Sequence, residues 1–248
     1  MTFFFALSGK SHLNLVVLQV LFANKDMNIP ERIQNIQNGL PANVRLLAVS
    51  KFQPIEKIQE AYRVGQRDFG ESRAQELKEK HAALPQDIRW HFIGHLQRNK
   101  IKYIAAFVHL IQSVDSAVLL SEIDKEARKN GRIIDCLLQL HVAQESTKFG
   151  FSPQECMNYL AGGEWKNLHN IRLCGLMAMA SLTNNQEQIR SEFSLVKDCF
   201  DQAKALYFAQ DDAFSHLSMG MSDDYPIALA CGSTMIRIGT FIFGARNY

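Results

Sequence analysis

The sequence predicts a single (β/α)8 barrel, which is a parallel sheet closed on itself inside a ring of helices. Eight short apolar segments alternate with segments of helical periodicity from Arg45 to the end of the 248-residue chain. Strict alternation of strand and helix implies a parallel sheet that is buried on both faces. Eight such units within roughly 220 residues fit a barrel, whose usual size begins near ~200 residues.

A third observation favours the barrel over an open, doubly wound sheet, which is the alternative. Such a sheet normally carries a glycine-rich dinucleotide turn after its first strand, whereas the first strand here runs into "SKFQP". No linker, low-complexity tract or short repeat divides the chain. We therefore expect residues 27–248 to form one domain.

The elements can be followed in order along the chain. A helix is expected at 27–40, and the first strand, "RLLAVS", leads into the helix "PIEKIQEAYRVG", which has Ile55, Ile58 and Ala61 at helical spacing. The other strands are expected at 68–71, 88–94, 108–114, 132–142, 168–179, 214–220 and 234–244. The other helices are expected to end at residue 84 and to span 98–107, 115–131, 152–163, 184–209 and 223–232. The stretch "SDDYP" predicts a helix start with Ser222 as the N-cap.

The first 26 residues are apolar in patches, but Lys10, His12 and Asn14 interrupt them. No apolar span of ~18 residues results, so a membrane helix is not expected. A basic start before the first apolar run is also missing, which argues against a signal peptide. We expect residues 1–26 to be an appended or poorly ordered extension.

Composition excludes several function classes. Apolar residues make up 47% of the chain and charged residues 21%, which is ordinary for a globular protein. The net charge of +2, without a Lys/Arg-rich run, gives no reason to expect a nucleic acid partner. The five cysteines are dispersed and form no metal-ligand spacing, so we expect reduced thiols, no structural metal and a cytoplasmic protein.

The barrel fold turns residue order into a set of site candidates, because active sites of barrels lie at the carboxyl ends of the strands. The candidates at or just after those ends are Lys51, Glu71, Ser72, His95, Ser113, Asp115, Met177, Met179, Ser218, Met219, Gly220, Arg237, Gly239 and Thr240. A metal pair of His91 and His95 is possible, but packing at the barrel mouth is the favoured interpretation.

Lys51 ends the first strand, and its position allows two interpretations. Burial disfavours the charged form of a lysine, lowers its pKa and makes its neutral amine a nucleophile, as in Schiff-base lysines. Alternatively, Lys51 reaches solvent and pairs with a carboxylate such as Glu71. Position alone favours the second interpretation.

The end of the chain changes that balance. In "GSTMIRIGT", Gly239 and Thr240 offer backbone N–H groups and a hydroxyl where a strand meets a loop, as in an anion-binding nest. Barrels often bind phosphate after strands seven and eight, where Ser218 and Thr240 supply hydroxyls. A reactive lysine that faces a phosphate nest suits pyridoxal phosphate, with Arg237 as the partner of its pyridine nitrogen. Because a guanidinium cannot accept a hydrogen bond, it would leave that nitrogen unprotonated and restrain decarboxylation and transamination.

Several stretches together resemble one family. They are "LLAVSK", "FGESRAQE", "WHFIGHLQRNK", "SVDS", "GLMAM" and "LSMGMSDDYPIALACGSTMIRIGTFIFGAR". With these motifs the chain resembles the YggS/PROSC-type pyridoxal phosphate homeostasis proteins over nearly all of residues 28–248. The resemblance implies a fold-type III barrel like the N-terminal domain of alanine racemase, with pyridoxal phosphate as cofactor.

The resemblance also implies roles for individual residues. Lys51 aligns with the Schiff-base lysine, Arg237 with the residue near the pyridine nitrogen, and Met219 is expected to line the same pocket. The phosphate contacts align with Ser218, Gly239 and Thr240. The family commonly has asparagine where this chain has Ser72, so one contact to the cofactor is expected to be missing or water-mediated.

The function implied by the resemblance is pyridoxal phosphate binding in vitamin B6 homeostasis and amino/keto acid balance, with apo enzymes or a regulator as further partners. A low-activity racemase is the alternative, but two-base racemisation needs a group on each face of the imine and only Lys51 is evident. The chain ends at Tyr248, just after the eighth strand, so we expect no second domain and a monomer. A cofactor-gated interaction module is a third hypothesis.

Overall fold

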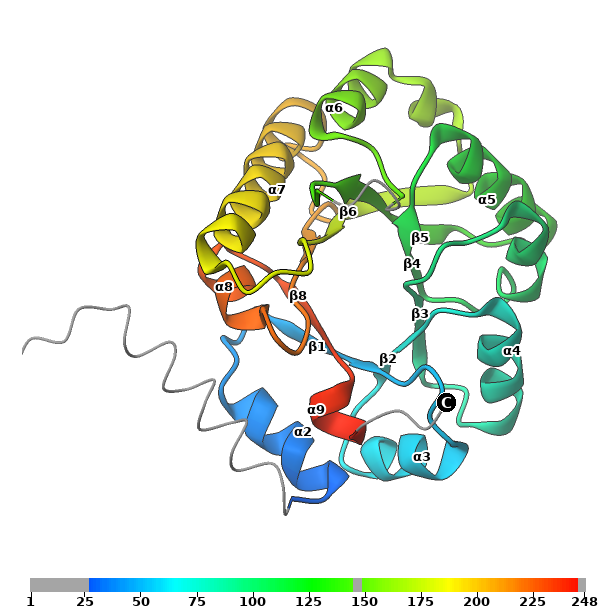
Figure 1. The fold of residues 1–248 in the computed structure, drawn as a ribbon. Helices are drawn as coiled ribbons and strands as arrows, with labels where there is room; N and C mark the ends of the chain where they lie inside the picture. Colours follow the sequence, from blue (N-terminus) through cyan, green and yellow to red (C-terminus); the bar gives the residue numbers. More distant parts are fainter. Residues whose placement is uncertain (1–26, 145–148, 245–248) are drawn as a thin grey trace, which may run out of the picture.

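The computed structural model describes residues 27–144 and 149–244, and at its centre is a closed barrel of eight parallel strands. Each strand is hydrogen-bonded to its neighbours in sequence, and β8 (Met235–Ile238) closes the sheet against β1 (Arg45–Val49). Figure 1 shows the helices as a ring outside the strands. The predicted barrel is therefore confirmed, whereas the expected extension at residues 1–26 lies outside the described residues.

The elements alternate along the chain as predicted. The strands between β1 and β8 are β2 (Asp68–Glu71), β3 (Arg89–Phe92), β4 (Leu110–Val114), β5 (Ile134–His141), β6 (Ile171–Met179) and β7 (His216–Ser218). The α-helices in the described ranges are α2 (Ile29–Asn38), α3 (Ile55–Arg63), α4 (Ala74–Ala83), α5 (Ala117–Lys129), α6 (Pro153–Gly162), α7 (Gln186–Tyr207), α8 (Tyr225–Ala230) and α9 (Thr240–Phe243). The 3₁₀ helices are η1 (Arg98–Tyr103) and η2 (Glu164–Asn167). Within these ranges, no helix is both long enough and apolar enough to span a membrane.

Three local predictions are corrected. The segment expected as a helix at 98–107 contains only the short 3₁₀ helix η1, since the N–H groups of Lys100 and Ile104 bond to carbonyls three residues back. The segment expected as one strand at 234–244 divides at Gly239 into β8 and α9. The N-cap of α8 is Asp224 and not Ser222, and the Asp224 carboxylate accepts the Met221 N–H.

Two apolar regions pack on opposite faces of the sheet. The side chains inside the barrel form a small cluster of Leu47, Leu110, Leu137, Cys174, Met177 and Met235. The alternate residues of the strands, such as Leu46 and Ala48 of β1, join the larger core between the sheet and the helices. Because side chains of a strand point alternately to opposite faces, this pattern decides which residues lie on the inner side of the sheet.

Candidate functional site

The ends of β1 and β8 lie side by side and bring two predicted site residues to one end of the barrel. In the β1–β8 pairing, Leu47 is opposite Arg237 and Ala48 is opposite Ile238. Leu47 belongs to the inner cluster, and Lys51 lies in the turn that follows the end of β1 at Val49. Lys51 is half-buried there. The carboxyl ends of β1 and β8 therefore bring Lys51 and Arg237 to the same rim of the barrel.

The turn that carries Lys51 is tied to helix α4 on both sides of the lysine. The Ser50 carbonyl accepts the Lys80 ammonium at 2.7 Å, and the Phe52 N–H donates to Glu76 Oε1 at 2.7 Å. Phe52 has a φ of 62°, which is uncommon outside glycine and is found where neighbouring contacts fix the backbone. The residues on either side of Lys51 are thus held in place from α4.

Glu71 contacts the α4 side of this turn. Its Oε1 accepts the Lys80 ammonium at 2.8 Å and the Ser50 hydroxyl at 2.6 Å, and the carboxyl group is fully buried. Burial raises the pKa of Glu71 to about 7, although the Lys80 cation and both hydrogen bonds oppose the change. The pairing partner that the structure gives Glu71 is therefore Lys80.

Arg237 is a buried cation held by oxygen atoms of two neighbouring strands. Its Nη1 donates to the Ser218 carbonyl at 2.8 Å and to the Ser218 hydroxyl oxygen at 2.7 Å, and its Nη2 donates to the Ala178 carbonyl at 2.8 Å. Burial lowers the pKa of Arg237 to about 10, and the charge of Asp224 opposes this change. The side chain therefore stays charged at neutral pH in a fixed orientation.

Ser218, the last residue of β7, and Met219, which follows it, differ in their surroundings. Ser218 is fully buried, and its hydroxyl donates to Gln112 Oε1 at 2.7 Å. Met219 is also fully buried, but its side chain belongs to the core between the sheet and the helices. Gly220 has a φ of 92°, and a Cβ there would lie 2.7 Å from Ala228 Cβ, so α8 packs directly against this loop. Of these two predicted site residues, Ser218 therefore points into the barrel and Met219 points toward the surrounding helices.

Gly239 and Thr240 form the junction between β8 and α9. Gly239 is the N-cap of this short helix, and its carbonyl accepts the N–H groups of Ile242 and Phe243. A Cβ on Gly239 would lie 3.1 Å from the Val49 carbonyl oxygen, so the backbones of β1 and β8 approach closely at this point. The first N–H groups of a helix have no acceptor inside it and can bind an anion.

Ser72 follows β2 beside a cavity of about 240 Å³ that Phe92 and His95 also line. Its backbone packs against Gly94, where an added Cβ would lie 2.3 Å from the Ser72 carbonyl oxygen. The position of the Ser72 backbone is therefore defined by its contact with the loop after β3.

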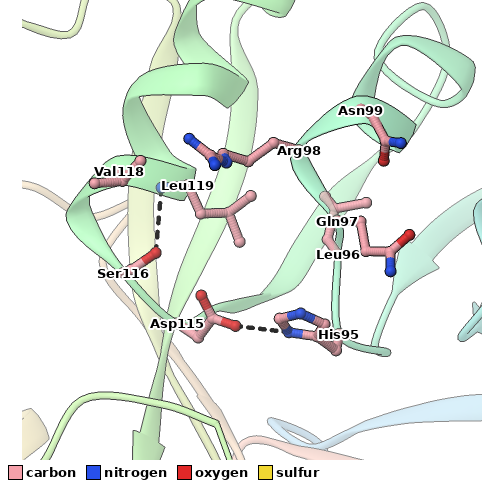
Figure 2. A pocket seen from close by; sticks show the side chains of 9 residues that line it. All are labelled: His95, Leu96, Gln97, Arg98, Asn99, Asp115, Ser116, Val118 and Leu119. Atoms are coloured by element: carbon pink, nitrogen blue, oxygen red, sulfur yellow. Dashed lines mark hydrogen bonds and ion pairs between the residues drawn. The ribbon is translucent and has the colours of Figure 1, made fainter.

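His91 and His95, the possible metal pair, lie in different surroundings. His91 is buried inside the barrel between Asp68 and Gln112, at 3.0 and 2.9 Å. His95 lies at the rim, where its Nδ1 is 2.9 Å from Asp115 Oδ2 (Figure 2). Among the described residues, no cluster of three His, Cys, Asp or Glu side chains could hold a metal ion.

The hollow drawn in Figure 2 has a volume of about 550 Å³ and lies between the loop after β3 and the start of α5. Asp115, Ser116 and Leu119 line one side, and residues 95–99 line the other. Lys51, Ser218 and Arg237 are not among its lining residues. This hollow therefore contains the candidates His95 and Asp115 but is distinct from the ends of β1, β7 and β8, where Lys51, Ser218 and Arg237 lie.

Sequence reasoning missed Lys80, Glu76 and Gln112. The i, i+4 spacing of Glu76 and Lys80 indicates an ion pair on α4, but it does not show that Lys80 is buried. Gln112 is next to the candidate Ser113, and strand alternation from Leu110 would have placed it inside the barrel.

Comparisons with known proteins agree on one family. The family model described as alanine racemase, N-terminal domain, matches residues 27–247. A pyridoxal phosphate homeostasis protein of Aquifex aeolicus is 40% identical over 208 residues, which cover 82% of this chain and 88% of that protein. The protein of the same name from Haemophilus influenzae is 38% identical over 240 residues, or 96% of this chain and 95% of that protein.

Solved structures give the same result. PipY of Synechococcus elongatus, solved without PLP, has a TM-score of 0.82 at 35% identity and covers 88% of this chain and 100% of its own. PipY solved with PLP bound has a TM-score of 0.79. Alanine racemase of Clostridium difficile has a TM-score of 0.65 at 15% identity, covering 89% of this chain and 56% of its own, which shows a shared fold alone. The predicted resemblance is confirmed, and the chain belongs to the pyridoxal phosphate homeostasis proteins, which share the fold of the alanine racemase N-terminal domain.

Proposed function

We propose that this chain binds pyridoxal phosphate at the barrel mouth and serves vitamin B6 homeostasis by holding and releasing this cofactor inside the cell. The observation that carries the proposal is the pairing of β1 with β8, which brings Lys51 and the buried cation Arg237 to the same end of the barrel. The names of the relatives and the PLP-bound structure of PipY support it.

The residues present fit the three chemical groups of this cofactor. Pyridoxal phosphate supplies, when bound, an aldehyde that a lysine amine can hold by a reversible covalent bond. Lys51 would provide that amine, and the backbone at Gly239 and Thr240 would bind the phosphate. At Gly239 the backbone lies close to β1, since an added Cβ would be 3.1 Å from the Val49 carbonyl oxygen.

Arg237 would lie beside the pyridine nitrogen. A guanidinium has hydrogen-bond donors and no acceptor, so the ring nitrogen beside it would stay unprotonated. The hydroxyl oxygen of Ser218 accepts Arg237 and would act through it. Ser72 and Met219 are proposed as further residues around the cofactor, and the outward side chain of Met219 leaves its backbone as the part that could make contact.

This arrangement favours holding the cofactor over turning over a substrate. An unprotonated ring nitrogen withdraws electrons weakly, so bond cleavage at an attached amino acid would be slow. Racemisation by two bases would need a second proton-transferring group across from Lys51. We therefore propose a binding protein and not an enzyme, and the names of the relatives agree with this.

The test is to add pyridoxal phosphate to the full chain, reduce the complex with borohydride and find the modified lysine by mass spectrometry. We expect a yellow complex with the label on Lys51, and none in Lys51→Ala. Lys78→Ala, which changes an exposed lysine of α4, is the matched control and should be labelled normally. A label on another lysine, or no label in the wild-type chain, would contradict the proposal.

The racemase alternative is tested with the same loaded protein. Incubation with L-alanine and other L-amino acids, followed by chiral analysis, should show no conversion beyond that caused by free cofactor. Fast interconversion of L and D amino acids at catalytic protein concentrations would show that the protein is a racemase and would contradict the proposed binding role.

A further inference from the structure

A chain of hydrogen bonds crosses the inside of the barrel and ends at Arg237. Arg237 Nη1 lies 2.7 Å from Ser218 Oγ, and Ser218 Oγ lies 2.7 Å from Gln112 Oε1. Gln112 Nε2 lies 2.9 Å from His91 Nδ1, and His91 Nε2 lies 3.0 Å from Asp68 Oδ1. The three middle side chains are fully buried. Five strands, β8, β7, β4, β3 and β2, each contribute one member.

The chemistry of the two ends gives this chain one direction. Arg237 can only donate, so the Ser218 oxygen accepts from it and the Ser218 hydroxyl proton goes to Gln112 Oε1. The amide nitrogen of Gln112 must then donate to His91 Nδ1. His91 therefore carries its proton on Nε2 and donates it to the Asp68 carboxylate.

Both ends of the chain are anchored. Arg89 donates two hydrogen bonds to the Asp68 carboxylate, from Nε at 2.8 Å and from Nη2 at 2.5 Å. Burial would raise the pKa of Asp68, but the hydrogen bonds from Arg89 and His91 hold it well below its ordinary value. The chain thus runs from a buried cation to a carboxylate that remains ionised.

Gln112 is the central member because it contacts both neighbours and a third group. Its amide nitrogen also lies 3.1 Å from the Met235 sulfur, which is a weak acceptor. The amide oxygen is thereby directed to Ser218 and the amide nitrogen to His91 and Met235. A glutamine in this orientation fixes the rotation of the Ser218 hydroxyl, which in turn presents a lone pair to Arg237.

We propose that Gln112 and His91 are positioning residues that orient Arg237 for the cofactor through the Ser218 hydroxyl. The proposal rests on the proposed function for the role of Arg237, but the orientation itself is a property of the cofactor-free barrel. It also assigns the Ser218 hydroxyl proton to Gln112. Ser218 therefore supports the guanidinium and has no proton to donate to a phosphate.

The test compares Gln112→Met with Gln139→Met in the full-length protein. Gln139 is a buried glutamine on the adjacent strand β5. It donates to the Phe149 carbonyl at 2.7 Å and is not part of the hydrogen-bond chain that ends at Arg237. Methionine keeps a similar volume in both variants while removing the amide. Gln139→Met removes one buried hydrogen bond, whereas Gln112→Met removes those to both Ser218 and His91, so Gln139→Met measures the general cost of removing a buried amide.

The first readout needs no cofactor. Nitrogen-15 NMR of the wild-type chain should show His91 neutral with its proton on Nε2, and slow rotation of the Arg237 guanidinium with separate Nη signals. Gln112→Met should shift the Nη1 signal of Arg237, which still donates to the Ser218 carbonyl, while Gln139→Met leaves that signal unchanged. A proton on His91 Nδ1, or averaged Arg237 signals in the wild type, would overturn the proposal even if the protein never bound pyridoxal phosphate.

The second readout uses the cofactor. Gln112→Met should bind pyridoxal phosphate about tenfold more weakly, the size expected from one disrupted buried hydrogen bond, and should shift the nitrogen-15 signal of the pyridine nitrogen. Gln139→Met should change neither quantity. Equal weakening in both variants would leave only a structural role and overturn the proposal.

A second variant, Gln112→Glu, covers the case in which Gln112→Met fails to fold. Glutamate keeps the acceptor for Ser218 and removes the donor to His91. The Arg237 signals should stay separate while His91 takes a proton on Nδ1. Averaged Arg237 signals with an unchanged His91 would contradict the proposed order of the chain.

Discussion

The Lys80 ammonium lies 2.8 Å from the Glu71 carboxylate, and this buried ion pair lies directly behind the residue that precedes Lys51. Lys80 also donates to the Ser50 carbonyl at 2.7 Å and to Glu76 at 2.6 Å, so one ammonium satisfies three oxygen atoms. The Glu76 carboxylate in turn accepts the Phe52 N–H. The backbone on both sides of Lys51 is therefore held by charged side chains that lie between the sheet and α4.

Replacing Lys80 with methionine should destabilise the fold by about 3–5 kcal/mol, because it leaves the buried Glu71 without its cation. The loss should be larger at pH 8 than at pH 6, since burial raises the pKa of Glu71 to about 7 and protonation at lower pH removes the unpaired charge. Urea unfolding at both pH values measures the effect.

The matched control for Lys80→Met is Lys78→Met, which changes an exposed lysine on the same helix and should alter stability by less than ~0.5 kcal/mol. Adding Glu71→Gln to Lys80→Met should recover part of the loss. Equal losses of stability in Lys80→Met and Lys78→Met would mean that the Lys80–Glu71 ion pair does not stabilise the fold.

Acid should destabilise the protein between about pH 6.5 and pH 4, because burial lowers the pKa values of His109 and His216 to about 4 from an ordinary 6.5. In this window the unfolded chain binds protons that the folded protein does not, so stability falls as pH falls. Glu71 acts in the opposite direction, since its raised pKa makes the folded protein hold a proton that the unfolded chain releases.

A histidine variant separates these opposing contributions. Between pH 7 and pH 5, the free energy of unfolding of His216→Gln should fall by about 1 kcal/mol less than that of the wild type. This figure already allows for the partial solvent exposure of His216. Urea midpoints of both proteins across this range provide the comparison. If stability fell more steeply with decreasing pH in His216→Gln than in the wild type, the lowered pKa of His216 would be contradicted.

Gly239→Ala should weaken pyridoxal phosphate binding at least tenfold and reduce stability by about 1–2 kcal/mol. The added Cβ would lie 3.1 Å from the Val49 carbonyl oxygen and 3.3 Å from Val49 Cβ, so the β1–β8 junction must open to admit it. Its φ of −118° is compatible with alanine, so the effect would come from contact and not from backbone strain.

Gly162→Ala is the control, because nothing lies within 4 Å of its added Cβ at the end of α6. That variant should gain up to about 1 kcal/mol from helix propensity. Titration with cofactor and thermal unfolding measure both variants. If Gly239→Ala bound the cofactor as well as the wild type does, the phosphate would not bind at Gly239 and Thr240.

The sequence predicted the repeating part of the structure better than its tertiary details. Alternating apolar patterns located the eight strands, because parallel strands buried on both faces have few other interpretations. The state of Lys80 could not be predicted, since Lys78 and Lys80 look alike in the sequence and only packing against β2 buries the second. Alternation from Leu110 could have placed Gln112 inside the barrel, but its partners His91 and Ser218 come from other strands and could not be predicted.

Ser72→Asn should bind pyridoxal phosphate more tightly than the wild type, by roughly threefold to tenfold, by restoring the asparagine that the family commonly has. The cavity of about 240 Å³ beside Ser72 has room for the longer side chain, and the contact with Gly94 holds the backbone in place. Stability should change by less than ~0.5 kcal/mol. Ser72→Ala, the control, should bind about as well as the wild type if the serine hydroxyl makes no direct contact. Weaker binding by Ser72→Asn would show that the loop after β2 does not approach the cofactor as proposed.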